Sequence, residues 1–349
     1  MVKSTNGVLV CGGAGYIGSH VVRNLRKHGL TIIVLDNFST GHLEAIPDGV
    51  EVVNGSIGDY KLLKAVLNDN NIDVVVHLCA NAYVGESMKN PIKYYNNNIA
   101  NGLVLLQSMI KANVKKMIFS SSCTVYGNPD SLPVTEKCSI LPVSPYGNTK
   151  AMFEQILADY SAAYNLGYCA LRFFNAAGAD EDGEIGEDHN PETHLIPSVL
   201  RSALYHECPE KIAKEMTELV VYGDDYTTID GTCMRDYIHV TDIANAHWLA
   251  YNYLMSGGES LALNLANEIG FTIFEIIRKC EEVTGHSIAY KIAERRDGDA
   301  DTLIGNAGKA FNVLGWRPSH SSVENIIATA WKWHKMHPGG YHPLKNSKL

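Results

Sequence analysis

The sequence lacks an apolar run long enough to cross a membrane, and residues 1–6 carry no apolar core of the kind that signal peptides have. It also lacks an excess of basic residues, since 38 Asp and Glu against 29 Lys and Arg give a formal net charge of −9. A chain of that charge is repelled by the phosphates of nucleic acids. We therefore expect a cytoplasmic protein that has neither a membrane nor a nucleic acid as partner.

Closely spaced cysteines are missing as well. The eight cysteines are scattered, no C-x-x-C pair occurs, and several, such as Cys11 and Cys169, lie inside apolar runs. This pattern is typical of buried thiols in a reducing compartment and not of a disulfide framework. We expect no disulfide framework and no bound metal.

The first half of the chain alternates between two kinds of segment. Short apolar runs predict buried strands at residues 8–11, 31–35, 50–54, 74–78, 116–120 and 168–173. Helix-length segments separate them at residues 19–28, 60–70, 99–112 and 149–165, and we expect Gly29 and Gly167 to end two of these helices. Such alternation predicts an α/β fold with a Rossmann-type, doubly wound parallel sheet.

The pattern changes after Phe174. Residues 179–192 are acidic and contain glycine, which indicates a loop that opens a second lobe. We predict a first domain of residues 1–178, rejoined by about 236–256, where a strand-then-helix pattern returns. Residues 179–235 and 257–349 would then form a smaller, mixed α/β lobe that binds the substrate.

A glycine-rich turn follows the first predicted strand. Gly12, Gly15 and Gly18 have the spacing that lets a backbone approach a pyrophosphate at the start of a helix. Asp36 ends the second predicted strand, where a carboxylate binds the hydroxyls of a ribose and repels a 2′-phosphate. No arginine follows in residues 37–42 to receive such a phosphate. The cofactor predicted is therefore NAD and not NADP.

Tyr146 and Lys150 lie about one helical turn apart if their segment is helical. An ammonium group beside a phenol favours the phenolate, which lowers the pKa of the tyrosine toward a range useful for proton transfer. The pair alone is common on exposed helices. It gains weight here because it accompanies a dinucleotide turn.

Three serines, Ser120 to Ser122, stand at the end of the fifth predicted strand. Ligands of parallel sheets bind beyond the carboxyl ends of the strands. A hydroxyl there can bind a sugar oxygen and share a proton with a nearby phenolate. The serines, the tyrosine and the lysine together predict a site for oxidation and reduction beside NAD.

These motifs have the order and spacing of a known family. The matching segments are residues 12–20, 35–37, 84–87, 94–98, 119–127, 144–150, 171–178, 230–239, 295–299 and 337–341. On them the chain resembles the extended short-chain dehydrogenases/reductases and, more narrowly, the UDP-glucose 4-epimerase family, over nearly its whole length. The resemblance implies an isomerase that interconverts UDP-galactose and UDP-glucose and keeps NAD as a resident cofactor.

The resemblance also implies the catalytic roles. Tyr146, as a phenolate, would take the proton of the sugar 4-hydroxyl while the hydride at C4 passes to NAD⁺. Lys150 would hold the nicotinamide ribose and lower the pKa of Tyr146, and Ser122 would orient the 4-oxygen. The 4-keto sugar would then turn over about its diphosphate link, and the hydride would return to its other face.

Further positions are implied to bind the two ligands. Those expected at NAD are Gly12, Gly15, Tyr16, Ile17, Gly18, Asp36, Asn37, Ser56, Ile57, Leu78, Asn97, Lys150 and Phe174. Those expected at the UDP-sugar are Ser122, Tyr146, Asn175, His194, Leu195, Tyr222, Arg235, Tyr237, Arg296, Asp299 and Leu303. Arginine suits the diphosphate because of its charge and its planar fork of donors.

Three positions depart from the best-known members of the family. Ser56 stands where they carry an aspartate that faces adenine, and Ala82 replaces a lysine near the nicotinamide. Leu303 aligns with a residue that limits the size of the sugar, and leucine is intermediate in size between the residues that exclude and admit N-acetyl sugars. We expect UDP-glucose and UDP-galactose as the main pair, with tolerance of N-acetylhexosamines.

Two alternatives remain open on the sequence. One is a 4-epimerase of another UDP-sugar, namely a UDP-N-acetylhexosamine, a UDP-pentose or a UDP-uronate. The other is a sugar-nucleotide 4,6-dehydratase, which is disfavoured because Cys123 and Thr124 follow Ser122 where dehydratases carry acidic residues. The resemblance also implies a homodimer in which two helices of each subunit, at residues 99–112 and 149–165, form a four-helix bundle.

Overall fold

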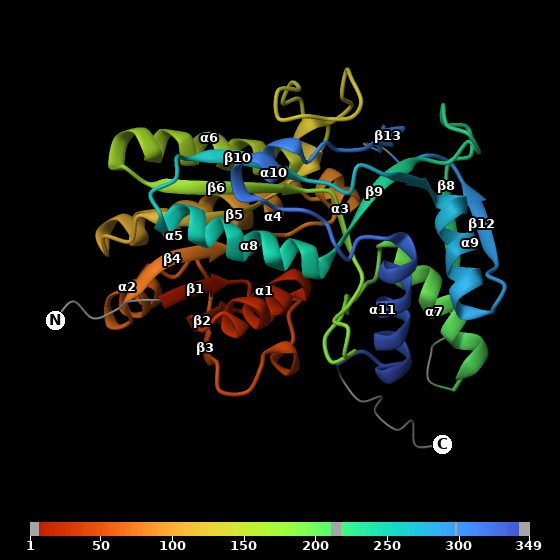
Figure 1. Ribbon diagram of the computed structural model, residues 1–349, viewed down its shortest axis with the longest axis horizontal. Coiled ribbons are helices and arrows are strands. Elements are labelled where there is room, and N and C mark those ends of the chain that lie inside the picture. Colours follow the sequence, from red (N-terminus) through yellow and green to blue (C-terminus); the bar gives the residue numbers. More distant parts are fainter. Residues whose placement is uncertain (1–6, 211–217, 297–298, 342–349) are drawn as a thin grey trace.

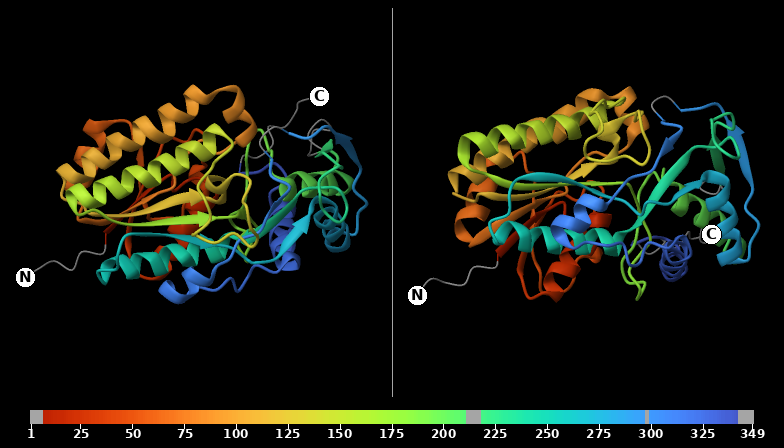
Figure 2. Two further views of the ribbon diagram at one scale, coloured as in Figure 1. Left: turned by 90° about the horizontal axis from the view of Figure 1, so that it is seen from above. Right: turned by 45° about the horizontal axis from the view of Figure 1, so that its top comes forward.

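A computed structural model describes residues 7–210, 218–296 and 299–341, and Figures 1 and 2 show its two lobes. The prediction that residues 1–6 lack the apolar core of a signal peptide falls outside the described residues. The larger lobe is built on β1 (Gly7–Cys11), β2 (Thr31–Asp36), β3 (Glu51–Asn54), β4 (Ile72–His77), β5 (Lys116–Ser122), β6 (Gly167–Phe173) and β10 (Leu261–Leu265). Among the described residues these form one seven-stranded parallel sheet in the order β10-β6-β5-β4-β1-β2-β3.

Helices cover both faces of this main sheet, which confirms the predicted doubly wound fold. One face carries α1 (Tyr16–Lys27), α8 (Val240–Met255) and α10 (Gly308–Leu314), and the other carries α2 (Tyr60–Asp69), α5 (Asn101–Lys111) and α6 (Pro145–Tyr164). Successive side chains of β1 point to opposite faces of the sheet. Val8 and Val10 are therefore buried under the first group of helices, and Leu9 and Cys11 under the second.

The smaller lobe has its own core. This lobe is built from α7 (Leu195–Glu207), β8 (Leu219–Tyr222), α9 (Ile273–Thr284), β12 (Tyr290–Ala293) and α11 (Val323–Met336). A second sheet of β7 (Asn175–Ala177), β9 (Met234–His239), β11 (Gly270–Thr272) and β13 (Thr302–Leu303) lies between the lobes, since Tyr237 of β9 is buried in the small core and Ile238 in the large one. The short elements are η1 (Leu43–Ala45), α3 (Val84–Lys89), α4 (Pro91–Tyr94), the π-helix η2 (Tyr95–Ala100) and η3 (Cys123–Tyr126).

Two strands lie elsewhere than their place in the sequence led us to expect. β10 falls in the segment expected for the small lobe, but it pairs with β6 at the edge of the main sheet because Leu263 and Leu265 complete the large core. β9 falls in the segment expected to rejoin the first domain, but it pairs with β7, β11 and β13. We propose the same division into two lobes, with β10 moved to the larger one.

Helix α6 begins one turn earlier than the expected residue 149. The Ser144 hydroxyl accepts a hydrogen bond from the Gly147 amide at 3.1 Å, and Pro145 occupies the first helical position. At the other end Asn165 takes the left-handed conformation, with a φ of 58°, so the expectation that Gly167 ends this helix was wrong. The early start places Tyr146 and Lys150 on one helix. None of the described helices is long and apolar enough to cross a membrane.

Candidate active site

The turn between β1 and α1 needs glycine at two points. Gly12 has a φ of +84°, which favours glycine. A Cβ on Gly18 would lie 2.0 Å from the Gly12 carbonyl oxygen, so only glycine lets α1 pack this closely on the turn. Gly18 therefore serves this packing, whereas Gly12 and Gly15 line an open pocket. The free amides at the start of α1 suit an anion there.

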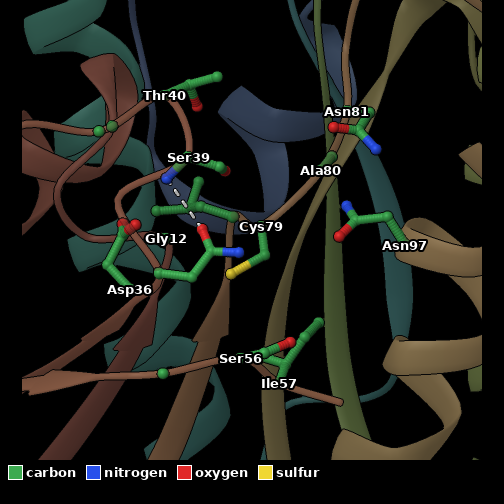
Figure 3. A pocket seen from close by; sticks show the side chains of 15 residues that line it. Gly12, Asp36, Ser39, Thr40, Ser56, Ile57, Cys79, Ala80, Asn81 and Asn97 are labelled. Carbon is green, nitrogen blue, oxygen red and sulfur yellow. Dashed lines mark hydrogen bonds between the residues drawn. The ribbon is translucent and has the colours of Figure 1, made fainter. Parts of the chain in front are cut away.

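The pocket at the carboxyl ends of β1, β2 and β4 has an empty volume of about 550 Å³ (Figure 3). It is lined by eight of the residues expected at NAD, namely Gly12, Gly15, Asp36, Asn37, Ser56, Ile57, Leu78 and Asn97. Seven further lining residues were missed by the sequence analysis, namely Ser39, Thr40, Gly41, Gly55, Cys79, Ala80 and Asn81. The available signal was the glycine at position 41. A Cβ there would lie 2.8 Å from the Ala14 carbonyl carbon, so this close approach requires glycine.

Asp36 supplies the charge of this pocket. Its two carboxylate oxygens accept hydrogen bonds from the backbone amides of Ala14 and Phe38, each at 2.9 Å. The carboxylate thereby ties the end of β2 to the glycine turn. Among the described residues that line the pocket, none is lysine or arginine. The Asp36 carboxylate would therefore repel a 2′-phosphate, and the lining offers no basic side chain to bind one.

Five of the residues expected at NAD do not line the pocket: Tyr16, Ile17, Gly18, Lys150 and Phe174. The Tyr16 hydroxyl donates to the Gly178 carbonyl at 2.6 Å and so links α1 to the loop that opens the small lobe. Ile17 and Phe174 pack in the large core.

The three serines at the end of β5 each contact a different residue of α6. The Ser120 carbonyl accepts a hydrogen bond from Lys150 Nζ at 2.6 Å, and the Ser121 hydroxyl donates to Glu154 at 2.5 Å. The Ser122 hydroxyl lies near enough to the Tyr146 hydroxyl to favour its phenolate. The structure thus brings the three expected catalytic residues together at the carboxyl end of the strand.

Burial sets the protonation of the tyrosine and the lysine. It raises the pKa of Tyr146 to about 12, although the neighbouring Ser122 hydroxyl works in the opposite direction. It lowers the pKa of Lys150 to about 7. Lys150 Nζ lies 5.7 Å from the centre of the Tyr146 ring, and its effect on the pKa of Tyr146 stays a prediction.

Asn98, in the π-helix η2, was missed by the sequence analysis. Its side chain accepts a hydrogen bond from the Asn81 amide at 2.9 Å and donates to Thr149 at 3.0 Å. Thr149 in turn donates to the Tyr146 carbonyl at 2.7 Å. This buried amide connects the pocket wall at Asn81 to the helix that carries Tyr146. The three successive asparagines at positions 96–98 were the available signal.

Most of the residues expected at the UDP-sugar lie around β9. Asp299 contacts Arg296 at 3.2 Å and Arg235 at 3.8 Å, and the Arg296 guanidinium lies 4.6 Å from the centre of the Tyr222 ring. Leu303 of β13 pairs with Arg235, and Asn175 of β7 pairs with Tyr237. Leu303 and Tyr237 are buried, whereas the two arginines are partly exposed.

His194 and Leu195 stand apart from this group, at the start of α7. His194 occupies the N-cap position without a capping bond from its side chain, and its Nδ1 lies 2.5 Å from a Glu187 carboxylate oxygen. The expected UDP-binding residues therefore come from two places, the β9 sheet and the α7 N-terminus.

A comparison with known families decides among folds of this kind. The sequence profile of the NAD dependent epimerase/dehydratase family matches residues 8–266, which is most of the chain. The chain belongs to this family.

Individual members of the family align with the chain almost from end to end. A UDP-glucose 4-epimerase of Halalkalibacterium halodurans is 48% identical over 98% of this chain and 99% of its own length. Two solved structures are also similar. The UDP-glucose 4-epimerase of Brucella ovis in complex with NAD has 44% identity and a TM-score of 0.88, covering 94% of this chain and 98% of its own. That of Bifidobacterium longum in complex with NAD⁺ and UDP has 37% identity and a TM-score of 0.90, covering 96% and 100%.

The charge of Asp36 gives a test of cofactor selection. Asp36→Asn keeps one oxygen acceptor but removes the charge, so we expect NAD affinity to fall about tenfold or more, in line with roughly 1.5–3 kcal/mol for hydrogen bonds to a charged group. The preference for NAD over NADP should fall with it. Binding constants for both cofactors, measured by fluorescence quenching, check this. The exposed Asp69→Asn is the matched control, and an unchanged NAD preference in Asp36→Asn would contradict the assignment.

Proposed function

We propose that this chain is an isomerase that interconverts UDP-galactose and UDP-glucose at C4 of the sugar, with Tyr146, Lys150 and Ser122 as its catalytic residues and NAD as its resident cofactor. The observation that carries this proposal is the convergence of the three side chains at the end of β5, in a chain of the epimerase family. The reaction involves no net oxidation, so the cofactor is regenerated in every turnover.

The residues of the pocket fit NAD. The glycine turn and the start of α1 suit a pyrophosphate, and Asp36 suits a ribose with free hydroxyls. When bound, NAD takes up the hydride of the sugar C4 and gives it back. Lys150, fixed by the Ser120 carbonyl, would hold the ribose next to the reacting carbon.

Tyr146 and Ser122 would handle the proton of the sugar. Ser122 lies beside Tyr146, so a 4-hydroxyl placed between them would find one group that orients it and one that accepts its proton. Burial raises the pKa of Tyr146 to about 12. A positive charge brought in with the cofactor would lower that pKa, and the same residue returns the proton when the ketone is reduced.

An epimerase must hold the nucleotide firmly and the sugar loosely. Arg235 and Arg296 are the cations around β9 that would bind the diphosphate, and both now contact Asp299. A diphosphate can replace that carboxylate as partner because arginine binds both anions with the same fork of donors. The sugar, held firmly only through its diphosphate link, would then be free to turn its other face to the cofactor.

Removing the phenol tests the role of Tyr146. We expect Tyr146→Phe to lower kcat by roughly 10²–10⁴-fold, the usual contribution of a positioned acid–base group, while NAD per chain stays unchanged. Epimerisation of UDP-galactose and NAD content after gel filtration are the two measurements. Tyr160→Phe, on the same helix but outside the site, is the control. Full activity of Tyr146→Phe would sink the assignment.

The sugar range is tested by a panel of substrates without added NAD. We expect UDP-galactose to be converted fastest and UDP-N-acetylgalactosamine more slowly, because Leu303 is smaller than the tyrosine that excludes N-acetyl groups. Product ratios for these two sugars and UDP-xylose rank the candidates. Failure to convert UDP-N-acetylgalactosamine at enzyme excess would reject the tolerance, and a faster reaction of UDP-xylose would favour the pentose alternative. Activity without added NAD tests whether the cofactor is resident.

We also propose a homodimer formed by α5 and α6. The two helices lie side by side (Figure 2), and Gly102 of α5 lies so close to Phe153 of α6 that a Cβ would come within 2.4 Å of that ring. Leu103 and Met152 leave apolar side chains exposed on them, at 38% and 48%. Gel filtration should give the mass of two chains, and the double variant Leu103→Glu, Met152→Glu should give one. A monomeric unsubstituted protein would remove this proposal.

A further inference from the structure

Four potential metal ligands meet in the loop between β7 and α7. Glu187, His189, Glu192 and His194 each offer one ligand atom, and these four atoms lie within 4.8 Å of one another. The proposed reaction gives no role to Glu187, His189 or Glu192. The pattern E-x-H-x-x-E-x-H in residues 187–194 was not recognised in the sequence, where no metal was expected.

The ligand atoms converge on a small space. The Nδ1 atoms of His189 and His194 lie 3.1 Å and 2.5 Å from the same oxygen of Glu187, and 3.9 Å and 3.7 Å from an oxygen of Glu192. Four ligands placed tetrahedrally about 2.0–2.2 Å from a zinc ion are separated by about 3.3–3.6 Å. Small rearrangements of these side chains would give that geometry.

A second observation points to a missing cation. The Glu192 side chain is only 5% exposed, and one of its oxygens, Oε2, has no hydrogen-bond partner. Its other oxygen accepts hydrogen bonds from the amides of Thr193 and His194. Arg201 lies 3.8 Å from Oε2, beyond hydrogen-bond distance. A buried carboxylate oxygen without a donor is costly, and a bound cation would remove that cost.

We propose that Glu187, His189, Glu192 and His194 bind one divalent transition-metal cation, and that zinc is the cation that fits best. Two imidazoles exclude the oxygen-preferring ions calcium and magnesium, and two imidazoles with two carboxylates suit zinc. The two carboxylates also balance the charge of a divalent ion.

The surroundings assign the ion a structural role. The His189 ring lies 6.4 Å from Tyr16 of α1 and 6.1 Å from Tyr83, both in the large lobe. His194 occupies the N-cap position of α7 in the small lobe. An ion bound here would fix the loop between the lobes and hold the start of α7, where the family resemblance implies that His194 and Leu195 bind UDP.

Metal content and zinc binding test the proposal on the holoenzyme. We expect one zinc per chain by elemental analysis after dialysis against zinc, its loss on chelation, and a fall in Tm that added zinc reverses. His189→Ala should weaken zinc binding by more than the roughly 10–100-fold that loss of an outer-shell partner costs. The control His206→Ala should leave zinc binding and its effect on Tm unchanged. It removes a histidine outside the cluster, whose ring stacks on His286 at a centroid distance of 5.5 Å.

Two outcomes overturn the proposal: no zinc bound by the unsubstituted chain, or binding lost in His206→Ala and kept in His189→Ala. Cobalt(II) gives a readout that does not depend on the folding of any variant. We expect the visible spectrum of tetrahedral cobalt in the unsubstituted protein, bleached by zinc, and an octahedral spectrum would contradict the ligand set. These measurements do not use epimerase activity, so they stand or fall separately from the proposed function.

Discussion

The contact between the end of β5 and helix α6 is the constraint on which the rest of the site depends. Two of three successive serines provide it, with the Ser120 carbonyl bound to Lys150 and the Ser121 hydroxyl to Glu154, and the third, Ser122, lies beside Tyr146. Arg172 of the neighbouring strand β6 also binds Glu154, at 2.9 Å. These bonds tie the helix to the sheet and place the Tyr146 phenol, the Ser122 hydroxyl and the Lys150 amine at one strand end.

Burial gives this arrangement its chemistry. Burial raises the pKa of Tyr146 and lowers that of Lys150, so the site opposes a charge on either side chain. The dinucleotide turn and Asp36 select the cofactor a few strands away, and Arg235 of β9 and Arg296 after β12 hold the nucleotide part of the substrate in the proposed function.

Much of the larger lobe could be predicted from the sequence, because its strands are short apolar runs and its glycines stand where a turn needs them. The start of α6 was placed late because the capping role of Ser144 and Pro145 was not used, and Asn165 took the place expected for Gly167. The place of β10 depends on pairing with β6, which lies almost ninety residues earlier in the chain, and no local pattern reveals it. Asn98 and the Glu187–His194 cluster were missed because their roles appear only once distant or looped segments meet.

The proposed mechanism requires that the hydride leaves C4 and returns to the same carbon, and this can be tested directly. UDP-galactose labelled with deuterium at C4 can be equilibrated with the enzyme in ordinary water, and the UDP-glucose formed can be examined by proton NMR. The account predicts that the product keeps the whole label at C4. Loss of the label to solvent would show that C4 is inverted by another route and would contradict the account.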